Sequence, residues 1–163
     1  TLATSSAASD VYKRQSSGIF TTVNSQNAIE SITRENLKQF DGMFFYTTGM
    51  LLPAGDPRDA LMEFIQSGKG FVGAHSATDT FKKYDNYVKM INGTFAGHPW
   101  TAGGTNGFTN HEPTHPTVAM LSKEFMWKDE IYQYNNFDPS VVRVLFSLNM
   151  AKSKPQMLSL IHI

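Results

Sequence analysis

Hydrophobic residues along this chain gather into short continuous runs separated by amphipathic stretches. Two runs have the length of a strand, residues 43–47 and 70–74, and neither alternates apolar with polar positions. Continuous runs of this kind are typical of strands that are covered on both faces, as in parallel sheets. The pattern therefore predicts two buried parallel strands.

The segment between these runs, residues 56–68, carries the signals of a helix. Asp56 predicts the N-cap, Pro57 the first helical residue and Gly68 the position just past the end. Its apolar residues fall on one face at Leu61, Phe64 and Ile65. A strand, a helix and a second strand in this order form a right-handed crossover. The fold class that follows is α/β, with a mostly parallel central sheet flanked by helices.

Weaker signals predict the remaining elements. Thr33 can cap a short helix through residue 40, and a helix over residues 84–91 would end at Asn92-Gly93. Residues 141–146 are rich in β-branched side chains and predict a strand. Residues 100–116 are rich in Gly, Thr, Asn and Pro and predict a long loop.

The two ends of the chain differ in composition from its interior. Residues 1–17 are rich in Ser, Ala and Thr without periodicity, and residues 158–163 are apolar without a cap or turn signal. Residues 1–17 are interpreted as a disordered or extraneous tail, and residues 158–163 as an extraneous tail. One incomplete domain is therefore expected over residues 18–157.

Charge and composition exclude several classes of protein. Fourteen basic residues balance fourteen acidic ones, so the sequence predicts neither nucleic acid nor an anionic membrane surface as a partner. No apolar run approaches the roughly 20 residues that a membrane span requires. Cysteine is absent, which excludes disulfides, thiolate metal sites and a cysteine nucleophile. We assign no cofactor, and assembly into a homo-oligomer stays open.

The carboxyl ends of the predicted strands are where ligands collect in such sheets. Thr48 and Gly49 follow the first strand, and His75 and Ser76 follow the second. His75 has small residues two places before and after it, as the tight turn of a nucleophile elbow requires. At the positive end of a following helix its imidazole would stay neutral and could act as a base.

Other interpretations of this turn stay open. His75 could lie at the edge of the core and bond only a loop carbonyl. Ser76 could be the nucleophile instead, although the sequence shows no definite base for it.

Further histidines and carboxylates follow between residues 98 and 130. A metal site is considered for four histidines and three carboxylates, namely His75, His98, His111, His115, Glu112, Asp129 and Glu130. His111 and His115 sit in a loop that contains proline, so the pattern has little specificity for a metal, and we assign none. Loop histidines that satisfy backbone groups are the simpler alternative.

A pocket for a sugar ring is predicted from residues of the same region. His98 and Trp100 could line it, with an imidazole donor and an aromatic wall, unless Trp100 only covers the core. Asp129 and Glu130 precede a strand-like segment, so one carboxylate could point inward and orient His75 or contact hydroxyls. A solvated strand end is the alternative.

Several motifs occur in a fixed order along the chain, namely residues 41–49, 68–80, 93–99, His115-Pro116 and 129–132. Taken together, they resemble the motifs of the ThuA-like (trehalose utilisation) family. The resemblance implies a class I glutamine amidotransferase-like fold, which is a flavodoxin-like three-layer sandwich. It also implies a role in the metabolism of trehalose or related sugars. His75, His98, His115, Asp129 and Glu130 fall on motifs that line the family's site.

Relatives of the wider fold carry cysteine at the elbow, whereas this chain has His75, so thiol-based glutamine hydrolysis is excluded. The family's opening strand and its closing Trp-containing strand are missing from the pattern. The expectation is a carbohydrate-processing enzyme with catalytic His75, Asp129 and Glu130. Its substrate-binding residues would be Thr48, Gly49, Ser76, His98, Trp100 and His115. A non-catalytic sugar-binding or interaction domain on the same fold and a metal-dependent hydrolase are the alternatives.

Overall fold

The computed structural model describes residues 18–23 and 31–155. The segments expected to be extraneous, 1–17 and 158–163, lie outside these residues. The chain divides into two compact units, Thr1–Ile91 and Asn92–Ile163, and each is described by itself.

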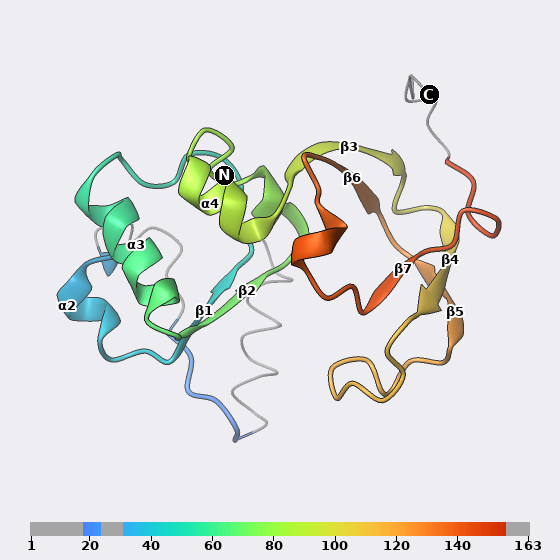
Figure 1. The fold of residues 1–163 in the computed structure, drawn as a ribbon, viewed down its shortest axis with the longest axis horizontal. Coiled ribbons are helices and arrows are strands. Elements are labelled where there is room, and N and C mark those ends of the chain that lie inside the picture. The colour runs from blue at the N-terminus through green and yellow to red at the C-terminus, as the bar shows by residue number, and fades with distance from the viewer. Residues whose placement is uncertain (1–17, 24–30, 156–163) are drawn as a thin grey trace. The chain divides into compact units, whose positions relative to one another are not determined.

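The first unit is a mixed helix and strand arrangement (Figure 1). Its elements are α2 (Arg34–Leu37), β1 (Gly42–Phe45), α3 (Asp56–Gln66), β2 (Gly70–Gly73), the 3₁₀ turn η2 (His75–Asp79) and α4 (Asp85–Ile91). Strands β1 and β2 pair in parallel, from Gly42 opposite Gly70 to Phe45 opposite Gly73. The predicted strand–helix–strand crossover is therefore confirmed.

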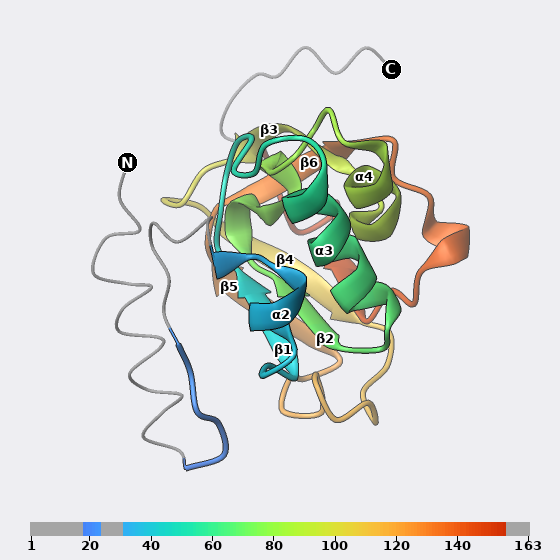
Figure 2. The same ribbon diagram turned by 90° about the vertical axis from the view of Figure 1, so that its left-hand side faces the viewer.

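Helix α3 supplies much of the first unit's core and runs alongside the two strands (Figure 2). Leu61 is completely buried and Phe64 nearly so, which confirms the predicted apolar face. The cap lies one residue earlier than predicted, because Gly55 is the N-cap and Asp56 already belongs to the helix. Gly68 follows the C-terminal end with a φ of 90°, a backbone conformation that favours glycine.

Two of the shorter predicted helices are also present. The Thr33 hydroxyl caps α2 by accepting from the backbone N–H of Asn36 at 3.2 Å, although this helix ends at Leu37. Helix α4 ends at Ile91, and Asn92 follows it with a φ of 57°.

The prediction that both strands are buried on two faces is wrong. Phe44 is 41% exposed and its register partner Val72 is 54% exposed. Opposite residues of paired strands project from the same face, so one face of this sheet is open within the described part of the unit. A run of apolar residues indicates that a strand is suited to burial. The strand is buried on a given face only if another layer of the structure packs against that face.

The second unit is built from antiparallel strands. They are β3 (Thr94–Trp100), β4 (Thr105–Asn110), β5 (Glu124–Lys128), β6 (Ile131–Asn135) and β7 (Phe146–Leu148), with the 3₁₀ turn η3 (Pro139–Val141) before β7. β3 pairs with β6, and β4 lies between β5 and β7 in a three-stranded sheet. The rings of Phe108, Phe125 and Phe146 pack together with centroids 5.2 to 5.9 Å apart.

These strands correct two predictions. Residues 100–116 contain the end of β3 and all of β4 as well as loops, because β4 pairs with β5 on one side and with β7 on the other, and these tertiary contacts override the turn preference of its residues. The predicted strand over residues 141–146 begins only at Phe146. Asp138 caps the 3₁₀ turn before it by accepting from the Ser140 N–H at 2.8 Å.

The fold class is therefore mixed α/β with several sheets. Of the expected mostly parallel sheet, the described residues contain the β1–β2 pair, and the other paired strands are antiparallel.

Candidate functional site

His75 stands at the sharp turn that the sequence predicts after β2. Its φ is 50°, the left-handed region that side chains other than glycine rarely adopt. The side chain is exposed, and its ring stacks on Tyr46 with centroids 5.4 Å apart and planes 19° from parallel. A strained backbone conformation costs free energy and persists only where the surrounding fold holds it in place. Such conformations are concentrated at functional sites.

Close packing on either side of His75 explains the small residues of the turn. A Cβ added to Gly73 would lie 2.9 Å from the Cβ of Ala77, which is itself buried. The Ala74 N–H donates to the Phe45 carbonyl at 2.8 Å and continues the parallel pairing to the turn. The steric requirement of an elbow is therefore met by residues 73 and 77.

The turn is followed by the five-residue 3₁₀ helix η2, not by an α-helix. The next α-helix begins at Asp85. The expected dipole of a following helix is thus reduced to that of a single short turn, and the role of His75 as a base stays a prediction.

We expect the strained backbone at His75 to affect the free energy of unfolding of variants at this position. His75→Gly should be more stable than His75→Ala by about 1 kcal/mol, because both variants lack the imidazole and only alanine retains the left-handed penalty. The measurement is urea unfolding of both variants. The same pair at Ser76, whose φ is not positive, should show the opposite order. Equal stability of the His75 variants would show that the turn carries no strain.

Thr48 and Gly49, which follow β1, contact η2 through Asp79. The Thr48 hydroxyl donates to the Asp79 carboxylate at 2.5 Å, and the Gly49 N–H donates to the Asp79 carbonyl at 3.1 Å. Lys82 donates to the second carboxylate oxygen at 2.8 Å. The hydrogen bond from Lys82 and then that from Thr48 lower the pKa of Asp79.

Asp79 was not predicted as a site residue. Its position four residues after His75 in the same motif was the available signal, but its partners Thr48 and Lys82 appear only in the structure. Ser76 lies beside this network, where its carbonyl accepts from the Thr80 hydroxyl at 3.4 Å.

In the second unit, the structure brings His98 and Glu130 together. Nδ1 of His98 lies 3.5 Å from Oε1 of Glu130. The imidazole packs beside two aromatic rings that also contact each other, Phe95, with ring centroids 6.0 Å apart, and Tyr132, at 6.3 Å. Phe95 and Tyr132 were not predicted as site residues. Glu130 thus has a histidine partner in its own unit, and the predicted pairing of Asp129 or Glu130 with His75 stays a prediction.

Asp129 and Trp100, two further predicted site residues, lie in the same unit as this pair. Asp129 is exposed, and its carboxylate accepts from the Glu130 N–H at 2.8 Å. Trp100 is only 6% exposed, and its indole N–H is buried without a partner among the described residues. Its sugar-stacking role stays a prediction, since a ring this buried offers little surface to a ligand.

His111 and His115 lie in and beside the loop after β4. Nδ1 of His115 accepts from the Thr117 N–H at 3.3 Å, the backbone role given as the simpler alternative. His111 shares a hydrogen bond of 2.8 Å with the Ser147 hydroxyl, and Glu112 accepts from Arg143 at 2.7 Å. Within residues 18–23 and 31–155, no three His, Asp or Glu side chains gather as metal ligands would.

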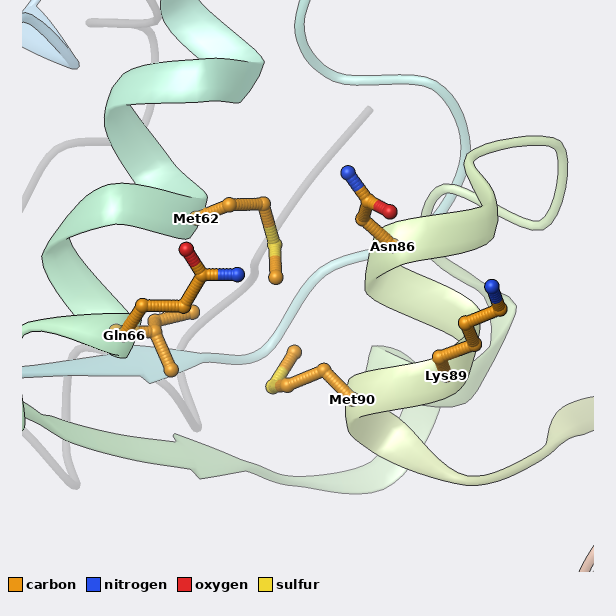
Figure 3. Close-up of a pocket in the computed structure, with 6 residues that line it drawn as sticks. Met62, Gln66, Asn86, Lys89 and Met90 are labelled. Carbon is orange, nitrogen blue, oxygen red and sulfur yellow. The ribbon is translucent and has the colours of Figure 1, made fainter.

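A separate groove of about 350 Å³ lies between α3 and α4 (Figure 3). It is lined by Met62, Ile65, Gln66, Asn86, Lys89 and Met90. None of the predicted site residues lines it, and its apolar walls offer few groups for chemistry. No helix in the described part of the chain is long and apolar enough to cross a membrane.

Comparison with known proteins identifies the same family as the sequence motifs. The family model ThuA, described as trehalose utilisation, matches residues 2–159. The chain belongs to this family. A crystal structure of a ThuA-like protein from Bacteroides uniformis ATCC 8492 is similar, with a TM-score of 0.70 and 22% sequence identity. The match covers 88% of this ThuA family chain and 60% of the Bacteroides protein. No curated protein matches the sequence.

At this level of identity, the Bacteroides structure establishes the ThuA-like fold alone. This chain spans 60% of the length of that protein.

Proposed function

We propose that this ThuA family chain belongs to a carbohydrate-processing enzyme that acts on trehalose or a related sugar. His75 would be its acid–base residue. The observation that carries the proposal is the imidazole held at a φ of 50° directly after a parallel strand. The family's association with trehalose utilisation supports a sugar as the substrate. We further propose that the complete protein has the flavodoxin-like, amidotransferase-like sandwich that the motifs imply.

The surroundings of His75 suit proton transfer to or from a hydroxyl. The side chain is exposed, so a substrate can reach it, and Tyr46 limits the ring's orientations by stacking on it. Thr48 and Ser76 lie on the segments that follow β1 and β2, where their hydroxyls could bind a sugar. Since general acid–base groups must lie within hydrogen-bond reach of the proton they move, this strand end is the place for the reacting hydroxyl.

The experiment is to replace His75 with Asn, which keeps a polar side chain that tolerates a positive φ. We expect turnover of trehalose, or of the most active sugar in a panel of glucosides, to fall by about 10²- to 10⁴-fold. The CD spectrum and the unfolding midpoint should change little. His111→Asn, the same change at a loop histidine in the other unit, is the matched control.

The outcomes separate the alternatives. Unchanged turnover in His75→Asn would remove His75 from the mechanism. Sugar binding by calorimetry without any product from the unmodified chain would favour a binding domain.

A further inference from the structure

The His98–Glu130 pair has features that go beyond a substrate contact. The edge of the ring that carries Nδ1 is turned toward a carboxylate, whereas the His98 side chain as a whole is 41% exposed. Nδ1 itself is buried and makes no complete hydrogen bond. The accessible part of the ring is therefore the Nε2 edge.

Two irregularities in β3 place His98 in this position. Between the pairs Phe95–Tyr134 and Gly97–Gln133, β3 advances by two residues while β6 advances by one. A second extra residue lies between Gly97 and Trp100. In a regular strand, residues three apart face opposite sides, but here Phe95 and His98 pack together. Bulges that turn a side chain in this way are common beside active sites.

Two aromatic side chains also pack against the imidazole of His98. Phe95 lies nearly parallel to the imidazole, with planes 22° apart, and Tyr132 packs against both rings, 4.5 Å from Phe95 and 6.3 Å from His98. Glu130 side-chain atoms are 24% exposed, so the carboxylate is partly shielded from water. The titratable groups that these contacts place at the ring are Glu130 and Tyr132.

From this geometry we propose that His98 is a second acid–base group, with Glu130 as the residue that positions it. Glu130 would hold the imidazole proton on Nδ1, which leaves the lone pair of Nε2 directed outward. The inference rests on the proposed function for its substrate class, a sugar hydroxyl. A base oriented by a third group through its far nitrogen is a recurrent catalytic arrangement.

The proposed step is the reversible transfer of one proton. The O–H bond of the hydroxyl breaks and leaves its electron pair on oxygen, while a new N–H bond forms at Nε2. The positive charge of the resulting imidazolium is balanced by the Glu130 carboxylate. The separation of 3.5 Å is at the long limit of a hydrogen bond, and such contacts are often loose before a substrate binds.

The test is the tautomer of His98, measured by nitrogen NMR on the chain labelled with ¹⁵N-histidine at a pH where the ring is neutral. Loss of one set of signals in His98→Asn assigns the residue. We expect a proton on Nδ1 in the unmodified chain and a shift toward the Nε2–H tautomer in Glu130→Gln. Asp129→Asn is the matched control, because it removes the adjacent charge and keeps an oxygen to accept from the Glu130 N–H. It should leave the tautomer unchanged.

A second readout follows the reactivity of Nε2. Modification of His98 by diethyl pyrocarbonate, located by mass spectrometry, should be slower in Glu130→Gln than in the unmodified chain and in Asp129→Asn. An Nε2–H tautomer in the unmodified chain, or equal tautomers and rates in all three proteins, would overturn the proposal. Neither readout requires turnover, so failure here is distinguishable from failure of the role of His75.

Discussion

Leu61→Ala is expected to lower the free energy of unfolding of the first unit by about 2–5 kcal/mol. Leu61 is completely buried in α3 and packs in the cluster that includes Phe45, Phe81 and Tyr87. Removal of its isobutyl group forfeits the burial of apolar surface and leaves a cavity that the surrounding aromatic rings can close only in part. The total stability of a domain is typically about 5–15 kcal/mol, so this single change could remove most of it.

Urea unfolding followed by tyrosine fluorescence measures this loss, because the buried Tyr87 reports on the same cluster. Leu61→Met is the control, since it nearly conserves volume and should cost less than about 1.5 kcal/mol. Equal losses in the two variants would show that the cluster is loosely packed and that α3 is not held by Leu61.

Gly73→Ala is expected to destabilise the elbow by about 1–3 kcal/mol and to displace His75. The added Cβ would lie 2.9 Å from the Cβ of Ala77, closer than two such carbons approach in folded proteins. Ile91 and Phe71 lie 3.6 Å away on other sides, so the new methyl group has little room to move. The turn itself must then shift, and the imidazole two residues later shifts with it.

The combination of Gly73→Ala with Ala77→Gly provides a decisive comparison, because it moves the methyl group from one side of the contact to the other. The double variant should be more stable than the sum of the two single losses predicts, by about 1 kcal/mol or more. Urea unfolding of all four proteins completes this cycle. Additive losses would show that residues 73 and 77 do not oppose each other across the turn.

Much of the first unit follows from local sequence signals. The Pro57 and Gly68 signals and the apolar face of Leu61 and Phe64 predict α3 to within a residue or two. The elbow at His75 is similarly local, since small residues two places on either side suffice to indicate it. Such features depend on sterics within a few residues of the chain, which the order of residues encodes directly.

Other parts of the site could not be predicted, because they depend on contacts between distant residues. Asp79 binds Thr48 across 31 positions of sequence, and no periodicity records that bond. Phe95 and Tyr132 reach His98 only because β3 contains two extra residues opposite β6. Strand β4 was missed because Thr, Asn and Gly favour turns unless neighbouring strands satisfy their backbone groups on both sides.

The order of residues alone identified the family through its motifs. It also determined the parallel β1–β2 crossover and the turn that presents His75, since these two features arise from runs of apolar side chains and from local sterics. Only the tertiary structure decided that Glu130 faces His98 and that one side of the β1–β2 pair stays open in the described unit. The physical reason is the distance along the chain over which the deciding interactions act. Backbone conformation is set by near neighbours, whereas burial and the pairing of charged groups are set by what packs against them after folding.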